Sequence, residues 1–397
     1  MANITLHPPR LARVTFLLLP LLILPALCRV ACSQTVTDVR PETSSARSHP
    51  KGWWPNEGSA PRSAYAGEQA CAACHPSEAV AWQGSQMAHA VKPAGESKFL
   101  RAHPHMSYQR GPYTYHIDLE GGQAIYSITG GGNTLSIPLL WAYGTGVVGQ
   151  AFVFRTNGIY YEAEAAYYPV QGKLSLVAGL EQTIPATPAE AFGLPLAPAA
   201  ARECISCHTT AAVVSSQLDV EHMVYGVSCE ACHGPGAHHA AAMSARGKRS
   251  KPAVTFIFNP AKLPPTQLEN FCGACHRTSL LVTSEGLHGL DTVHYEPYRL
   301  EMSKCWIMTR RITCVTCHNP HQRLRRIAAD YDSACLSCHL SKPGHITVSH
   351  PGKACPVATR NCVTCHMPKC RLPLAPFTMS DHFIRVVGPG DACAKSS

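Results

Sequence analysis

Cys229-Glu-Ala-Cys232-His233 and Cys314-Val-Thr-Cys317-His318 are two of seven copies of the pattern Cys-x-x-Cys-His in this 397-residue chain. This pattern is the attachment signature of c-type haem. We number the copies motif 1 to motif 7 in chain order. Their cysteine pairs are Cys71/Cys74, Cys204/Cys207, Cys229/Cys232, Cys272/Cys275, Cys314/Cys317, Cys335/Cys338 and Cys362/Cys365. The histidines that complete them are His75, His208, His233, His276, His318, His339 and His366.

The spacing of each motif suits one porphyrin. Two cysteines three positions apart lie on one side of a helical turn, so both thiols can reach the vinyl groups of the same haem. The histidine that follows can then bind the iron as proximal ligand. The sequence therefore predicts seven covalently attached haem c groups per chain, held by the motif cysteines and by the motif histidines.

Two other uses of paired cysteines fit the pattern less well. Structural zinc sites join two such pairs, or one pair and two histidines, and need no histidine directly after the second cysteine. Redox disulfides of the thioredoxin kind do not repeat seven times in one chain.

Each iron also has a sixth coordination position. Fifteen histidines lie outside the motifs, and His7 and His49 fall in the N-terminal leader, so enough remain for bis-histidine ligation. The sequence contexts favour six of them as distal ligands: His89, His222, His238, His321, His350 and His382. A surface or hydrogen-bonding histidine is the alternative for each. Weaker candidates are His103, His105, His116, His288, His294 and His345, and the competing methionines are Met87, Met223, Met302, Met367 and Met379.

The N-terminus resembles a secretory signal. Arg10 and Arg13 precede an apolar run, Val14 to Leu27, that is too short and too interrupted by proline for a membrane span. We expect an exported protein, periplasmic or on the cell surface of a bacterium. Membrane association is expected only through an uncertain lipid anchor at Cys28 or Cys32.

The formal net charge of +9 does not indicate a nucleic-acid partner. Seven haems bring roughly 14 propionate charges, partly offset by the ferric cores, and the basic residues can pair with them. The partners we expect are redox proteins that donate and accept electrons, and the oligomeric state is left open.

Composition and spacing predict the fold class, α+β with little regular structure. From Ala201 to Pro368 six motifs share 168 residues, so porphyrins must supply much of the interior of a helical and loop-rich, haem-packed region. The boundaries we expect are 1–28 for a signal peptide, 29–65 for a flexible leader, 66–110 for a first haem segment, 111–200 for a β-rich insert, 201–387 for the six-haem region and 388–397 for a tail.

The β-rich insert is predicted from alternating apolar residues between glycine turns. Five segments carry this alternation, and Asn157-Gly158 between the last two is a strong hairpin signal. They are 113–119, 124–128, 134–138, 150–155 and 158–163. We expect one antiparallel meander of five or six strands, serving as a structural platform or as a docking surface.

Four further cysteines lie outside the motifs and beyond the leader: Cys305, Cys355, Cys370 and Cys393. In an oxidising compartment they are candidates for disulfides. A catalytic thiol is the alternative, and Cys305 is the best candidate for that role.

Several segments resemble the cytochrome c-554-type family of multihaem proteins. They are Glu68-Gln-Ala-Cys-Ala-Ala-Cys-His-Pro76 with Trp82, Gly226-Val-Ser-Cys-Glu-Ala-Cys-His-Gly-Pro-Gly236, Thr313-Cys-Val-Thr-Cys-His-Asn-Pro-His321 and Asn361-Cys-Val-Thr-Cys-His-Met-Pro-Lys369. The resemblance covers roughly Tyr65 to Val387. It implies electron transfer, with distal ligands at His238, His321 and His382. Seven motifs rather than four is a departure from that pattern.

Electron transfer without bond making is the function that the sequence favours. The alternative is a haem oxidoreductase that acts on a small nitrogen or sulfur compound at one open iron, which requires acid/base groups beside it. His116, His294, Tyr295 and Arg299 are the first candidates for such groups. No catalytic residue is assigned.

Overall fold

The computed structural model describes residues 53–58, 60–180, 183–215, 217–246, 256–339, 355–372, 374–388 and 393. The expected signal peptide, most of the expected leader and the candidate ligand His350 lie outside these ranges. In the described residues no helix is long and apolar enough to span a membrane.

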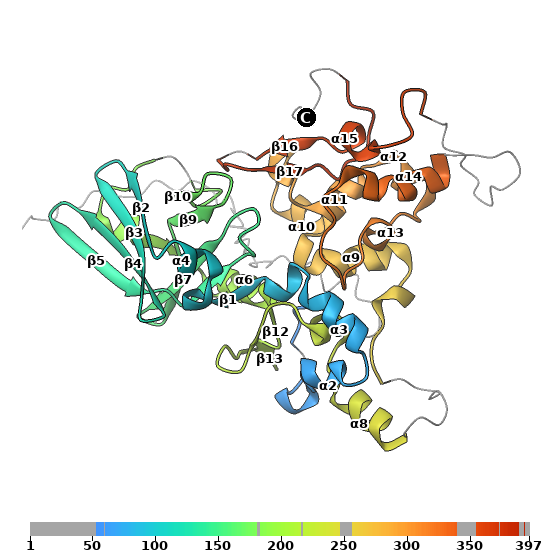
Figure 1. The fold of residues 1–397 in the computed structure, drawn as a ribbon, viewed down its shortest axis with the longest axis horizontal. Coiled ribbons are helices and arrows are strands. Elements are labelled where there is room, and N and C mark those ends of the chain that lie inside the picture. The colour runs from blue at the N-terminus through green and yellow to red at the C-terminus, as the bar shows by residue number, and fades with distance from the viewer. Residues whose placement is uncertain are drawn as a thin grey trace, which may run out of the picture. The chain divides into compact units, whose positions relative to one another are not determined.

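Strands dominate the chain between motifs 1 and 2. A four-stranded antiparallel sheet has the order β2-β3-β4-β5, with β2 at His105–Arg110, β3 at Tyr113–Glu120, β4 at Gln123–Gly130 and β5 at Asn133–Pro138 (Figure 1). In β3 the side chains of Tyr113, Tyr115 and Ile117 are buried while the residues between them are more exposed. That alternation is what the sequence predicted, because a strand turns successive side chains to opposite faces.

A second sheet has the order β1-β6-β7-β8-β11. Its strands are β1 Val91–Pro93, β6 Trp141–Tyr143, β7 Ala151–Thr156, β8 Ile159–Ala163 and β11 Gly193–Pro195. The β7–β8 hairpin pairs Thr156 with Ile159, so its loop is Asn157-Gly158. Both loop residues have positive φ, 49° and 80°, as a two-residue hairpin of the primed type requires.

The five predicted strand segments are therefore present, but the single meander is wrong. The last bond from this segment to β4 is donated by the Leu139 N–H to the Ala124 carbonyl at 2.8 Å. The next residue, Leu140, donates instead to the Val153 carbonyl of β7 at 2.8 Å, so the chain passes into a separate sheet before β6. The β-rich part also begins before residue 111, since β1 and β2 lie in the expected first haem segment.

The largest hydrophobic core of the described residues lies in this β-rich part. It includes Tyr115, Tyr126, Phe152 and Phe154, all without exposed surface. The Glu164 carboxylate is buried here but accepts hydrogen bonds from Tyr115 Oη at 2.6 Å and Arg110 Nη1 at 2.7 Å. A buried charge with a cationic partner and satisfied oxygens is tolerated.

Small strands and short helices complete this half of the chain. The strands are β9 Ala165–Tyr168, β10 Lys173–Leu176, β12 Thr209–Thr210, β13 Val213–Val214, β14 Gln217–Leu218 and β15 Val224–Tyr225. The helices are η1 Arg62–Ala64, α2 Glu68–Ala72, α3 Pro76–Gln83, η2 Met87–His89, η3 Ala94–Glu96, α4 Lys98–Ala102, α5 Pro188–Phe192 and α6 Pro198–His208.

From motif 3 onward the chain is mostly short helices joined by loops (Figure 1). They are α7 Cys229–His233, α8 Ala237–Arg246, η4 Pro260–Lys262, α9 Pro265–His276, α10 Ser279–Ser284, η5 Gly289–Thr292, α11 Glu296–Glu301, α12 Lys304–Thr309, α13 Cys314–Cys317, η6 Ala328–Tyr331, α14 Asp332–His339 and α15 Cys362–His366. One two-stranded ribbon, β16 Lys369–Arg371 with β17 Thr378–Ser380, follows motif 7.

The flexible leader expected over 29–65 ends earlier than predicted. Trp53 donates its indole N–H to the Ala231 carbonyl at 2.8 Å, and Trp54 is 3% exposed against Phe271. Arg62 forms an ion pair with Asp219 at 2.8 Å. Two adjacent tryptophans supply enough apolar surface to fix a segment that is otherwise polar. We call residues 53–65 without residue 59 the N-terminal strap.

Candidate haem-binding sites

The seven motifs lie on short helices. Motifs 2, 3, 4, 6 and 7 end α6, α7, α9, α14 and α15, motif 5 forms α13 with His318 as its cap, and motif 1 begins in α2. All fourteen motif cysteines are free thiols, and no motif histidine is buried. A reduced pair of thiols beside an accessible imidazole is the donor set that haem c requires, so these residues fit the cofactor.

In three pairs of histidines, the ring centroids are separated by about the distance expected for two imidazoles that bind one iron. The ring centroids are 6.5 Å apart for His75 and His239, 5.9 Å for His233 and His321, and 6.3 Å for His318 and His382. A metal-bound imidazole nitrogen lies about 2 Å from its metal, and the ring centroid about 1 Å beyond it, so two axial imidazoles have centroids about 6 Å apart. Each pair joins one motif histidine to one histidine outside the motifs.

The structure brings His321 and His382 to motif histidines, and it places the other predicted distal ligands differently. His89 Nε2 is 2.8 Å from the Gln83 carbonyl, and His222 Nδ1 is 2.8 Å from Asp219. The ring of His238 lies 4.1 Å from that of Phe256. Sequence reasoning passed over its neighbour His239, although successive residues of a helix point about 100° apart and one of the two had to face another way.

Several motif histidines are oriented by a second hydrogen bond at Nδ1. The acceptor is a backbone carbonyl for His208 (Ala90, 3.1 Å), for His233 (Phe258, 2.9 Å) and for His366 (Arg385, 2.8 Å). This bond fixes the tautomer and leaves Nε2 free for a metal. Burial lowers the pKa of His208, which favours the neutral form that binds iron.

His276 has a different partner. Its Nδ1 lies 3.4 Å from Oε2 of Glu296. The Glu296 carboxylate beside it raises the pKa of His276 to about 9, while the pKa of Glu296 is lowered by His276 despite burial.

Neighbouring motifs touch through their cysteines. Helix α2 of motif 1 packs against α7 of motif 3. There the Cys229 thiol beside it raises the pKa of Cys71, while the pKa of Cys229 is lowered. Helix α9 packs against α13 and helix α14 against α15, so motif 4 meets motif 5 and motif 6 meets motif 7. The Cys272 thiol raises the pKa of Cys314 at the first of these contacts.

Motifs 2 and 4 also meet, through Cys207 and Cys275. Asn56 of the N-terminal strap lies at this contact. Its amide donates to Cys207 Sγ at 3.3 Å and to the Ala274 carbonyl at 2.8 Å, while its oxygen accepts from Cys275 Sγ at 3.4 Å.

Not every motif cysteine is enclosed in this way. Cys74, Cys338 and Cys365, the second cysteines of motifs 1, 6 and 7, are exposed, as is Cys204, the first cysteine of motif 2. At these four positions the polypeptide alone does not enclose the thiol. Haem attachment stays a prediction from the motif spacing at all fourteen motif cysteines.

The exposure has a local cause. In motifs 1, 6 and 7 the first cysteine is the one that lies toward a neighbouring motif. The second lies three residues further on, past the end of α2 in motif 1 and next to the last residue of the helix in motifs 6 and 7. Polar neighbours accompany two of these second cysteines: Ser337 Oγ is 3.9 Å from Cys338 Sγ, and Thr364 Oγ1 is 3.8 Å from Cys365 Sγ. A porphyrin bound through both thiols of a motif would cover the outer one with apolar surface.

A carboxylate reinforces three of the contacts between motifs, and we call each one a carboxylate clasp. Glu230 of motif 3 is 3% exposed and accepts from the backbone N–H groups of Ala66, Gly67 and Gly236 at 2.7 to 2.9 Å, which fixes the approach to motif 1. Carboxylates at the N-terminal ends of helices satisfy backbone N–H groups that have no partner within the helix.

The other two clasps share one spacing. Glu269, three residues before motif 4, accepts from the Cys314 backbone N–H of motif 5 at 2.9 Å. Asp332, three residues before motif 6, accepts from Cys362 N–H of motif 7 at 2.8 Å and from Asn361 N–H at 2.7 Å. A repeated E/D-x-x-C-x-x-C-H pattern in the sequence was the signal that could have found them.

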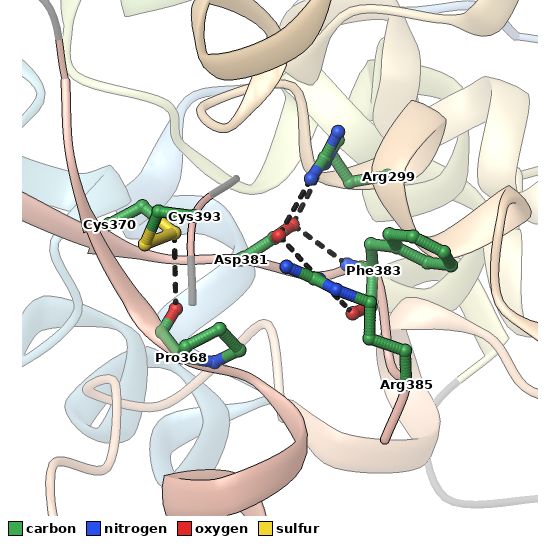
Figure 2. The surroundings of a disulfide bond; sticks show 7 residues. All are labelled: Arg299, Pro368, Cys370, Asp381, Phe383, Arg385 and Cys393. Atoms are coloured by element: carbon green, nitrogen blue, oxygen red, sulfur yellow. Dashed lines mark hydrogen bonds and ion pairs between the residues drawn. A yellow bond between two sulfur atoms is a disulfide. The ribbon is translucent and has the colours of Figure 1, made fainter. Parts of the chain in front are cut away.

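A buried ion cluster lies beside His382. Figure 2 shows the Asp381 carboxylate between two guanidinium groups: Arg299 Nη2 is 2.6 Å and Arg385 Nη1 is 2.7 Å away. Asp381 has no exposed surface and also accepts from Phe383 N–H at 3.0 Å. The Arg385 carbonyl accepts a hydrogen bond from His366 Nδ1. The ion cluster therefore connects motif 7 to the segment that carries His382.

Near this cluster Cys370 and Cys393 form a disulfide (Figure 2). The two other cysteines considered for disulfides, Cys305 and Cys355, are free thiols. Burial raises the pKa of Cys305, which disfavours the reactive thiolate.

The candidate acid/base groups for an enzyme do not share one site. His116 lies within β3 of the four-stranded sheet, whereas Arg299 is engaged by Asp381. His294 and Tyr295 are adjacent rings, with centroids 3.9 Å apart, near Arg277.

Apolar side chains near motifs 5 to 7 remain exposed, unlike those of the β-rich core. Ile307 is 51% exposed, Ile327 67% and Val357 87%. A pocket of ≈ 160 Å³ opens beside motif 5 and is lined by Cys317, His318 and Tyr331 among others. The exposed apolar side chains of Ile307, Ile327 and Val357 are costly in water and suit a large apolar cofactor. Repeated attachment motifs, facing histidine pairs and uncovered apolar surface together define a c-type cytochrome.

The chain is similar in parts to known multihaem cytochromes. The family model for cytochrome c554 and c-prime matches residues 188–234, which contain motifs 2 and 3. Multiheme cytochrome MtrA of Shewanella baltica (strain OS185) is 25% identical over 190 residues, covering 37% of this chain and 55% of the relative. The chain thus spans about half the length of that curated relative. The crystal structure of outer cell wall cytochrome OcwA aligns with a TM-score of 0.42 and 14% identity, over 83% of this chain and 81% of that chain. With its motifs, the chain is a multihaem cytochrome c.

Proposed function

We propose that this chain carries seven covalently bound haem c groups and transfers electrons along them between redox proteins. The observation that carries the proposal is the contact between cysteines of different motifs. Each thioether sulfur is two bonds from its porphyrin ring, so two haems whose sulfurs touch have neighbouring edges. The bound haems supply the electron-accepting chemistry, and the chain's residues set their spacing, ligands and burial.

The cysteine contacts give an order to the haems. Motif 1 adjoins motif 3, motif 4 adjoins both motif 2 and motif 5, and motif 6 adjoins motif 7. For the two remaining links we propose that motif 3 leads to motif 4 and motif 5 to motif 6, since these motifs are consecutive along the chain. The resulting path is 1-3-4-5-6-7, with motif 2 as a branch at motif 4.

The facing pairs of histidine rings support our assignment of the iron ligands. The motif histidines are proximal, and His239, His321 and His382 are the distal ligands of motifs 1, 3 and 5. His239 takes the place of the predicted distal ligand His238. His89, His222 and His350 stay proposed for the remaining irons. Bis-histidine ligation keeps potentials low, which suits a carrier between two other redox proteins.

The proposal includes export to the periplasm or cell surface, with a signal peptide at residues 1–28. The apolar run that follows Arg13 supports this, because a positive start before a short apolar stretch is the pattern of a secretory signal.

Intact mass and spectroelectrochemistry test the proposal together. The mature protein should carry the mass of seven haems, and all seven irons should be reduced reversibly by a low-potential mediator. A mass that matches the polypeptide alone, or one that matches bound zinc, would refute it. A high-spin iron whose spectrum shifts with nitrite or hydroxylamine would favour the oxidoreductase instead.

A further inference from the structure

The carboxylate of Glu296 differs from the other groups that orient motif histidines. His208, His233 and His366 each donate Nδ1–H to a neutral carbonyl oxygen. His276 has an anionic oxygen in the corresponding position, at 3.4 Å. Motif 4 therefore differs from motifs 2, 3 and 7 in the charge that its histidine faces.

The fold holds Glu296 at this place. His276 is the last residue of α9 and Glu296 is the first residue of α11, and these two helices pack against each other. Pro297 next to it is buried and fixes the start of α11. The position of the carboxylate is thus set by helix packing rather than by a mobile loop.

Glu296 Oε2 is covered by protein, and in the described part of the chain it has no hydrogen bond of good geometry. A buried carboxylate oxygen without a donor is costly. His276 Nδ1–H is the donor placed to satisfy it, since a shift of a few tenths of an ångström brings 3.4 Å into the hydrogen-bonding range.

A histidine that donates to a carboxylate becomes a more basic ligand. A more basic ligand, and the negative charge itself, stabilise ferric over ferrous iron, and protein around the carboxylate strengthens the effect because it excludes water. The neutral carbonyls at the other three histidines do much less of this.

We propose that Glu296 is a positioning residue which lowers the potential of the haem of motif 4, at the branch of the path, below those of motifs 2, 3 and 7. This inference rests on the proposed function. An electron would then leave motif 4 readily toward motif 2 or motif 3, so the branch distributes electrons rather than storing them.

The test is a redox titration of the haem-loaded full chain with the substitution Glu296→Gln, which keeps the shape and an acceptor oxygen but removes the charge. The expected result is a positive shift of one wave among the seven that exceeds every other shift, with an altered low-spin EPR signal for that haem. The haem of motif 5 should shift less, because the Glu296 charge also acts on its proposed ligands His318 and His382. Glu301→Gln is the matched control. Glu301 ends the same helix and bonds Ser279, and its substitution should leave every wave in place.

An unchanged set of waves in a fully loaded Glu296→Gln protein overturns the inference. If that variant loads fewer haems, Glu296→Asp replaces it, because the shorter side chain withdraws the charge from Nδ1. A positive shift of one wave in Glu296→Asp supports the inference, and an unchanged set overturns it. Haem content below seven in the wild-type protein would instead refute the proposed function.

Discussion

Two adjacent histidines of α8 illustrate how side-chain direction decides which of them faces a motif histidine. His239 faces the ring of His75, whereas His238 lies against Phe256. Buried acids decide the motif contacts in the same way: Glu269 has no exposed surface, and it reaches the N–H of Cys314. Both features follow from side-chain direction, which spacing in the sequence only partly determines.

We expect His239→Ala to remove the sixth ligand from one haem. One of the low-spin signals in the EPR spectrum should be replaced by a high-spin signal, with the other haems unchanged. His238→Ala, one residue away, is the matched control and should keep all signals. If His238→Ala produced the high-spin signal and His239→Ala did not, His238 would be the ligand and the prediction would be wrong.

Glu269 predicts a pH-dependent stability. Burial raises the pKa of its carboxyl to about 7 from the ordinary value near 4.5. Because the folded-state pKa is the higher one, the stabilisation is complete below pH 4.5 and is lost as the pH rises through 7. The loss amounts to about 3 kcal/mol. Denaturant titrations at pH 5 and pH 8 measure it, and Glu269→Gln should remove this part of the difference. An identical pH dependence in both proteins would contradict the prediction.

At the level of elements, short motif helices are held in pairs by carboxylates that cross from one motif to the next. The helices α7, α9 and α14 each supply one, and the N–H groups that donate to them precede or begin motifs 1, 5 and 7. Helices of four to twelve residues are marginal by themselves. Their stability therefore depends on these contacts and on the cofactor.

Removing the Glu230 carboxylate should weaken the pair formed by motifs 1 and 3. Glu230→Ala leaves three backbone N–H groups without their acceptor, at a cost on the order of 3 kcal/mol. Chemical denaturation of the haem-loaded protein measures this cost. Glu221→Ala, an exposed glutamate nine residues earlier, should change the unfolding free energy little. An equal loss of unfolding free energy in the two variants would show that the buried hydrogen bonds of Glu230 do not stabilise the protein.

At the level of the whole molecule, two kinds of interior coexist. The β-rich part holds the largest core of aromatic and aliphatic side chains among the described residues. The buried apolar residues of the helical part, such as Leu268, Phe271 and Leu300, belong to none of the described core clusters. One part can fold by side-chain burial, and the other requires porphyrins to complete its interior.

In protein produced without haem attachment, the β-rich part should stay folded and the helical part should not. Hydrogen exchange should remain slow in β2 to β8, which carry the core, and fast in α9 to α15. The haem-loaded protein, measured in parallel, should protect both parts. Equal protection of α9 to α15 without haem would contradict a cofactor-built interior.

The sequence predicted the motifs, the strands of the insert and the Asn157-Gly158 hairpin, because each depends on local spacing. It did not predict the division into two sheets or the docking of the tryptophans in the N-terminal strap. These features depend on long-range packing, such as Trp54 on Phe271. The choice of His239 over His238, and the difference between paired and exposed motif cysteines, depend on it too.

The N-terminal strap has a consequence for the timing of maturation. Trp53 bonds Ala231, 178 residues later, and Asn56 bonds Ala274, 218 residues later. The N-terminal strap is synthesised long before its partners, so it can dock only when the chain through motif 4 has been made and its helices have formed. Docking of Asn56 between Cys207 and Cys275 is then a late step that closes over a correctly assembled second and fourth motif.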